Sequence, residues 1–190
     1  PQGGTAIGTG VNSHKNFSKN FCEALDKVSG LKVKPASNLF QGLSSQDNAA
    51  ELSSTLKNLS LVLMKICNDL RWMNSGPLTG LSDIELEALQ PGSSIMPGKV
   101  NPVIPEAVSM ACADVLGNDL TISVAVQNGN FQLNVMLPVI AYNLLKSINL
   151  LGNCMPLLAK KCIKSFKVNK KSVQENLNRN PILVLSLIHI

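Results

Sequence analysis

Residues 92–101 (GSSIMPGKVN) gather groups that could act on a small anion. Two adjacent serines, Ser93 and Ser94, follow a glycine, and Lys99 and Asn101 come shortly after them. A lysine can hold a carboxylate as a point charge, and an asparagine offers donors and an acceptor. A serine oxygen acts as a nucleophile or base only where N–H groups or cations stabilise its alkoxide. The residues alone therefore predict an anion-binding loop.

A serine with a nearby lysine also occurs in hydrolases, where the lysine follows the serine by one helical turn. Here Ser93 and Lys99 lie six positions apart, and Pro97 and Gly98 stand between them. This spacing does not fit the hydrolase arrangement.

Helical periodicity dominates the chain that must position this loop, and strand signals are weak. In the second predicted helix, leucines and an isoleucine recur every three or four residues from Leu52 to Leu70. Pro138 and Pro156 fall inside the fourth and should end or kink it. The pattern predicts helices at about 13–29, 46–74, 103–127, 132–165 and 170–178, with Gly30 capping the first.

The predicted fold is therefore all-α: a bundle of long helices with a functional loop at about 76–101. The apolar faces are too wide to be buried within a few helices, so we expect other subunits to complete the bundle.

The composition excludes two classes of function, nucleic-acid binding and membrane spanning. Of 190 residues, 45% are hydrophobic and 15% charged, with a net charge of +5. The lysines concentrated at 160–171 lack the aromatic partners of a nucleic-acid surface, so we expect no nucleic-acid partner. No stretch is long and apolar enough for a membrane span.

The five cysteines have no metal-ligand spacing, and only two histidines are present, so we expect no metal and no cofactor. Reduced thiols indicate a cytoplasmic protein.

The string GSSIMPGKVNP resembles the characteristic loop of the fumarase/aspartase superfamily, and the resemblance extends over about residues 2–184. NGNFQLNV (128–135) and GPLTGL (76–81) are similar to class II fumarases. NPVIPE (101–106) is also common in aspartate ammonia-lyases. The resemblance implies reversible hydration of fumarate to L-malate in the full-length protein. Aspartate ammonia-lyase, or a non-catalytic structural protein of the same fold, are the alternatives.

The resemblance also assigns roles. Ser93 corresponds to the catalytic base, and Glu106 to a glutamate important for activity. Ser94, Lys99, Val100 and Asn101 correspond to residues that contact the dicarboxylate substrate. Without the resemblance, Glu106 would be interpreted as an acid stabilised by the dipole of a helix's first turn.

Other features imply that the chain is a fragment. The family's site also needs GRTH-type and SSN-type segments, and neither occurs in this sequence. Family members are homotetramers whose sites combine residues from three subunits, so we expect the isolated chain to be inactive. We expect residues 1–184 to be part of the central helical domain. Leu185–Ile190 (LSLIHI) matches a translated sequencing adapter, and we expect it to be a non-native tail.

Overall fold

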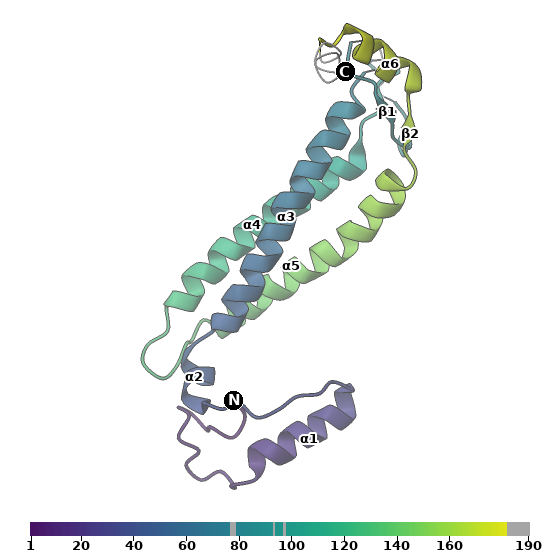
Figure 1. Cartoon of the computed structure of the whole chain (residues 1–190). Coiled ribbons are helices and arrows are strands. Elements are labelled where there is room, and N and C mark those ends of the chain that lie inside the picture. Colours follow the sequence, from purple (N-terminus) through teal and green to yellow (C-terminus); the bar gives the residue numbers. More distant parts are fainter. Residues whose placement is uncertain (77–78, 93, 97, 182–190) are drawn as a thin grey trace, which may run out of the picture. The chain divides into compact units, whose positions relative to one another are not determined.

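The computed structural model describes residues 1–76, 79–92, 94–96 and 98–181 of the chain. Ser93 and the expected tail at 185–190 lie outside the described residues. The helices are α1 (Phe17–Ser29), α2 (Leu39–Ser44), α3 (Asp47–Met73), α4 (Val103–Gln127), α5 (Leu137–Leu158), a π-helical turn η1 (Ala159–Ile163) and α6 (Lys170–Arg179) (Figure 1). The all-α prediction is confirmed.

The short helix α2 and the two strands were not predicted. The short helix α2 follows Asn38, whose side-chain oxygen accepts a hydrogen bond from the N–H of Gln41 and so caps it. Strands β1 (Ile84–Glu85) and β2 (Lys167–Val168) pair antiparallel, with Ile84 opposite Val168. Two-residue strands carry no detectable alternation, so periodicity could not reveal them.

The chain divides into two compact units. Unit 1 contains residues 1–56 and 116–147, and unit 2 contains residues 57–115 and the described residues from 148 onward. Residues of α3, α4 and α5 contribute to both units, and the 92–101 loop belongs to unit 2.

The core of unit 1 consists of a small apolar cluster and a buried side-chain hydrogen bond next to it. Ile122 and Ala125 of α4 pack with Ile140 of α5. Beside them the buried Ser53 hydroxyl donates to Asp119 Oδ1 at 2.7 Å. Buried polar groups are costly unless they are paired, so this bond fixes the register of α3 against α4.

Asn134 explains why α5 begins at Leu137 and not at the predicted residue 132. Its fully buried side-chain amide donates to the carbonyls of Ala125 and Val126 at 3.0 and 3.2 Å, and its oxygen accepts from the N–H of Met136 at 2.8 Å. One side chain thus joins the end of α4 to the start of α5. Pro138 falls in the first turn of α5, where an N–H is not needed, and so does not break the helix.

Pro156 also does not end α5. The α-helix continues through it to Leu158 and then changes to the π-type turn η1, in which the N–H of Lys164 bonds the carbonyl of Ala159 at 3.0 Å.

The buried face of α3 combines small and large side chains. Ser53, Ser60, Leu63, Cys67 and Leu70 are buried, whereas Leu52 of the predicted apolar stripe is 41% exposed. Leu63 and Leu70 of that stripe thus face inward, while near the start of the helix Ser53 takes the inward position beside Leu52. The helix therefore leaves part of its apolar surface uncovered.

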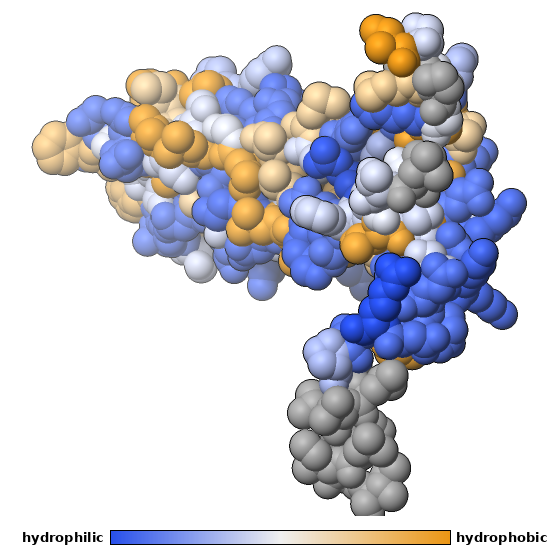
Figure 2. Space-filling model, turned by 90° about the horizontal axis from the view of Figure 1, so that it is seen from above, coloured by the Kyte–Doolittle hydropathy of each residue, from blue (hydrophilic) through white to orange (hydrophobic). Residues whose placement is uncertain are grey.

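Large apolar side chains are consequently exposed along the long helices. Figure 2 shows apolar residues, in orange, at the surface among polar ones. They include Val62 and Trp72 of α3, Met110 and Leu120 of α4, and Tyr142 and Leu145 of α5. Large exposed apolar patches mark interaction sites in many proteins. None of the described helices has the length and hydropathy that crossing a membrane requires.

Three fully buried thiols lie in unit 2: Cys67 on α3, Cys112 on α4 and Cys162 in η1. Burial, reinforced by the nearby Cys112, raises the pKa of the Cys67 thiol to about 11. Burial likewise raises the pKa values of Cys112 and Cys162. These thiols remain protonated near neutrality and act as small packing groups.

Shortening Ile122 to alanine should lower the free energy of unfolding by roughly 2–5 kcal/mol, because the side chain is fully buried and its removal leaves a cavity. Urea denaturation followed by circular dichroism measures the change. Thr121→Ala, at the exposed neighbouring position, should change it by less than about 0.5 kcal/mol. Equal effects of the two substitutions would contradict this account of the core.

Iodoacetamide at pH 8 should alkylate the half-buried Cys22 much faster than Cys67, as followed by peptide mass spectrometry. The thiolate is the reacting form, and a pKa near 11 keeps its fraction at Cys67 small until the pH approaches that value. In denaturant the two rates should converge. A Cys67 rate equal to that of Cys22 in the folded chain would show that Cys67 is accessible and unperturbed.

Candidate active site

The segment that leads into the 92–101 loop is folded back onto the C-terminal end of α3. Ser75 accepts hydrogen bonds from the N–H groups of Leu81 and Ser82, through its hydroxyl at 3.0 Å and its carbonyl at 2.7 Å. The side-chain oxygen of Asn74 accepts from the N–H of Leu86 at 2.8 Å. Residues just past the helix end thus supply the partners that the segment's backbone requires.

The same segment is held from its other side by the C-terminal part of unit 2. In addition to the β1–β2 pairing, the N–H of Asn169 bonds the carbonyl of Asp83 at 2.9 Å. The Ser172 hydroxyl donates to the carbonyl of Leu81 at 2.7 Å, and Asn176 Nδ2 donates to Asp83 Oδ1 at 3.1 Å. In Figure 1, β1, β2 and α6 lie at the same end of unit 2.

Two glycines shape the loop itself. Gly98 has φ +82°, a left-handed conformation that side chains other than glycine's rarely adopt. A Cβ on Gly92 would lie 3.2 Å from the carbonyl oxygen of Lys99, so the two arms of the loop approach closely there. The N–H of Lys99 closes a turn onto the carbonyl of Met96 at 3.1 Å.

A pocket of about 540 Å³ opens between this loop and the end of α3. Four predicted site residues line it: Lys99, Val100, Asn101 and Glu106. Glu106 sits in the first turn of α4 and is half-buried, whereas Lys99 and Asn101 are exposed. The fold therefore brings these four residues together, although side chains from other elements make up the rest of the wall.

The other two predicted residues are the adjacent serines. Ser94 is exposed and is absent from the pocket's lining as far as the described residues show. Ser93 lies outside the described residues. The described residues of the loop are exposed, including Ile95 at 87% and Met96 at 49%.

The end of α3 adds residues that were not predicted as site residues. Asn68, Arg71 and Trp72 of α3 line the same pocket, and their spacing of three and one places them on one helical face. Ser75, just past the end of the helix, lines it as well. Arg71 supplies a second cation. The signal was present in the sequence as a run of polar and aromatic residues at helical spacing beside the buried Cys67 and Leu70.

The pocket offers a defined set of interactions. Arg71 and Lys99 are cations, the side-chain amides of Asn68, Asn74 and Asn101 can donate hydrogen bonds, and Glu106 is an acid or base. Two cations and several amides suit a small anion that carries more than one carboxylate. Among the described residues, no group of three or more His, Cys, Asp or Glu side chains could hold a metal ion.

A second pocket of about 590 Å³ adjoins the first and shares with it Asn74, Gly76, Val100, Asn101 and Pro102. Its other polar lining includes Glu85, Glu87 and Lys167. The loop residues Val100 and Asn101 thus line both pockets.

Several known proteins that are similar to this chain in sequence or in fold are lyases. The profile of the lyase family matches residues 1–117. Fumarate hydratase class II 2 of Pseudomonas aeruginosa is 60% identical over 186 residues, which cover 98% of this chain and 41% of that protein.

Two solved structures have closely similar folds. Fumarate lyase:delta crystallin from Brucella melitensis, bound to cobalt, superposes with a TM-score of 0.93 at 41% identity, covering 99% of this chain and 41% of that one. Recombinant class II fumarase from Schistosoma mansoni gives a TM-score of 0.88 at 38% identity, covering 91% of this chain and 39% of that one. These likenesses agree with the resemblance read from residues 92–101.

Proposed function

Since the chain belongs to the lyase family, we propose that it supplies part of the active site of a class II fumarase, which hydrates fumarate reversibly to L-malate. The observation that carries this proposal is the pocket in which Arg71, Lys99, Asn101 and Glu106 meet. A site of two cations and several amides is complementary to a dicarboxylate with one carbon–carbon bond between its carboxyl-bearing carbons.

The chemistry assigns each residue a task. In the direction from malate, a base removes a proton from C3, and negative charge develops on the adjacent carboxylate. Lys99 and Asn101, which line the pocket, stabilise that charge. The hydroxyl group on C2 then leaves with a proton from an acid, which yields fumarate and water. Because the C3 proton is weakly acidic, preorganised electrostatic stabilisation must supply much of the rate enhancement.

Ser93 is proposed as the base, and this role rests on the sequence resemblance alone. Ser94 and Val100 are proposed to contact the substrate. Glu106, half-buried in the first turn of α4, is proposed to be important for activity. Arg71 is added here as a second group that attracts and orients a carboxylate, because it lines the same pocket as Lys99.

The chain spans about 41% of the length of the fumarate hydratase it matches, so the complete activity belongs to a longer assembly. We propose that residues 1–184 are part of its central helical domain and that residues 185–190 are not native. The large exposed apolar side chains of α3, α4 and α5 support assembly into a homotetramer with shared sites. Five free cysteines support a cytoplasmic location.

The test is a hybrid protein in which residues 1–184 replace the matched stretch of the Pseudomonas aeruginosa fumarate hydratase. We expect the hybrid to form fumarate from L-malate, measured by the absorbance of fumarate, and the 190-residue chain alone to show no turnover. L-Aspartate, assayed in the same way, should give no fumarate. Fumarate formed from L-aspartate in place of L-malate would assign the chain to aspartate ammonia-lyases, and a folded hybrid inactive on both would refute catalysis.

Within the hybrid, Lys99→Met should lower kcat/KM for L-malate by about 10²-fold, because it removes a cation from the developing carboxylate charge. Arg71→Gln should act mainly by raising KM, since orienting a carboxylate is needed equally before and during the reaction. Steady-state kinetics separates the two effects. Lys160→Met, an exposed lysine of η1 away from the pocket, is the matched control and should change neither constant. Equal losses in all three variants would indicate only a general charge effect.

A further inference from the structure

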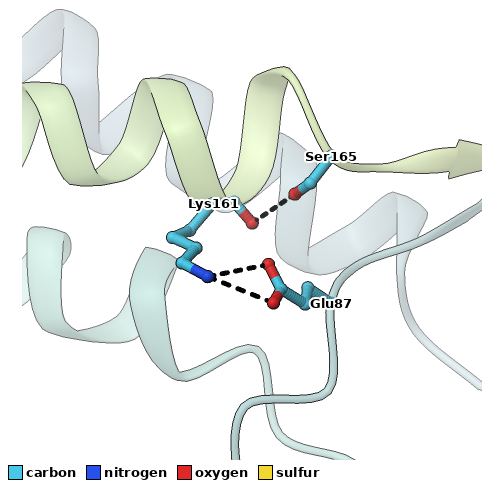
Figure 3. Close-up of polar contacts among 3 residues, drawn as sticks. All are labelled: Glu87, Lys161 and Ser165. Carbon is cyan, nitrogen blue, oxygen red and sulfur yellow. Dashed lines mark hydrogen bonds and ion pairs between the residues drawn. The ribbon is translucent and has the colours of Figure 1, made fainter.

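An ion pair joins two segments of unit 2 that are far apart in the sequence. Lys161 Nζ lies 3.1 and 3.3 Å from the two carboxylate oxygens of Glu87, as Figure 3 shows. Glu87 stands shortly after β1, on the segment that leads into the 92–101 loop. Lys161 stands in η1, the π-helical turn that ends α5.

The π-helical turn sets the direction in which Lys161 faces. Leu158 and Cys162 are buried, at 4% and 1% exposure, which fixes the inner side of this turn. The Lys161 side chain is left 42% exposed and reaches Glu87. The Ser165 hydroxyl donates to the carbonyl of Lys161 at 2.7 Å, so the backbone of this residue is also held (Figure 3).

The pair also lies against the other end of the loop. Glu87, Lys161 and Cys162 border a narrow crevice of about 10 Å³, whose remaining walls are Leu86, Leu89 and residues 102–105 at the start of α4. So small a volume is a packed seam and not a binding site. The proximity of the Glu87 carboxylate to Cys162 also contributes to the raised pKa of that thiol. The chain segments before and after the loop therefore meet at this ion pair.

The exposure of the pair limits what it contributes to global stability. Both side chains are about two-fifths exposed, and pairs of this kind contribute only about 0–1 kcal/mol. The effect of the pair on the local position of the loop can be larger than its effect on global stability. The pair joins η1 to the base of a loop whose Lys99 and Asn101 line the pocket, and small displacements of such groups are costly in catalysis.

We propose that Lys161 and Glu87 are positioning residues that close the base of the 92–101 loop and hold Lys99 and Asn101 at the pocket. This inference rests on the proposed function for its kinetic consequence, but not for its structural one. The pair is not itself proposed to react with the substrate, and it acts through the loop.

The experiment uses the hybrid protein with Lys161→Met, Glu87→Gln and the charge-exchanged double variant Glu87→Lys with Lys161→Glu. Lys160→Met is the control, because it removes a neighbouring exposed charge that forms no pair with Glu87. Two readouts are taken: kcat for L-malate, and hydrogen exchange of the peptide that covers residues 88–102. Thermal denaturation checks that all variants fold.

Each single variant should lower kcat by about two- to five-fold and speed hydrogen exchange in the 88–102 peptide, with little change in Tm. The double variant should restore both readouts in large part, and raising the salt concentration to about 1 M should move the unchanged hybrid toward the single variants. Neither the rescue nor the salt effect is expected from a residue that only packs.

Single variants with the kcat and exchange of the unchanged hybrid would overturn the positioning role while leaving the proposed function intact. Losses that the charge exchange does not rescue would overturn it as well, since they would reflect general packing. If the unchanged hybrid is inactive, the proposed function fails, and hydrogen exchange alone still decides whether the pair holds the loop.

Discussion

The backbone N–H and C=O groups of residues 81–86 lie outside any long helix and need hydrogen-bond partners from other segments. Most of the candidate site depends on which residues supply these partners. Ser75 and Asn74 provide acceptors from one side, and Asn169, Ser172 and Asn176 contact the segment from the other. A buried or partly buried backbone without such partners would be costly. Because the segment is fixed on both sides, the loop that follows it begins from a defined point, and Lys99 and Asn101 can line the pocket that Arg71 and Glu106 complete.

The long helices bury small polar and thiol side chains together with aliphatic ones, and they leave other large apolar side chains exposed. Ser53, Ser60, Cys67 and Cys112 allow close approach of α3 and α4, and their polar atoms are paired or protonated within the core. Leucine, methionine and tyrosine side chains of the same helices remain accessible. The interior thus includes small polar side chains, while large apolar side chains remain at the surface. A site whose residues are mostly exposed, such as Lys99 and Asn101, fits the same arrangement.

The sequence predicted best what depends on local periodicity. The bounds of α4 coincide with the predicted 103–127, and α3 differs from 46–74 by one residue at each end, because both helices bury a continuous face and end at breaker residues. Gly30 caps α1 in the left-handed conformation, as predicted. Lys99, Val100, Asn101 and Glu106 were identified from a local motif and do share one pocket. By contrast, the β1–β2 pairing and the Lys161–Glu87 contact join segments far apart in the chain, and Arg71 gains its significance only from the loop opposite it. Contacts between distant segments depend on the tertiary structure, and the periodicity of the sequence does not predict them.

The π-helical turn at Ala159–Ile163 has a consequence for how this region can change by mutation. A π-type turn holds one residue more than the α-type turn that it replaces. Deleting a single residue between Pro156 and Ser165 would let an α-type turn replace the π-type turn, so that the helix stays continuous and later residues keep nearly the same direction around its axis. The side chains inside the turn would be redistributed around the axis, and Lys161, which contacts Glu87 from within the turn, would be displaced. In this stretch the length of the chain therefore sets which side chain reaches Glu87.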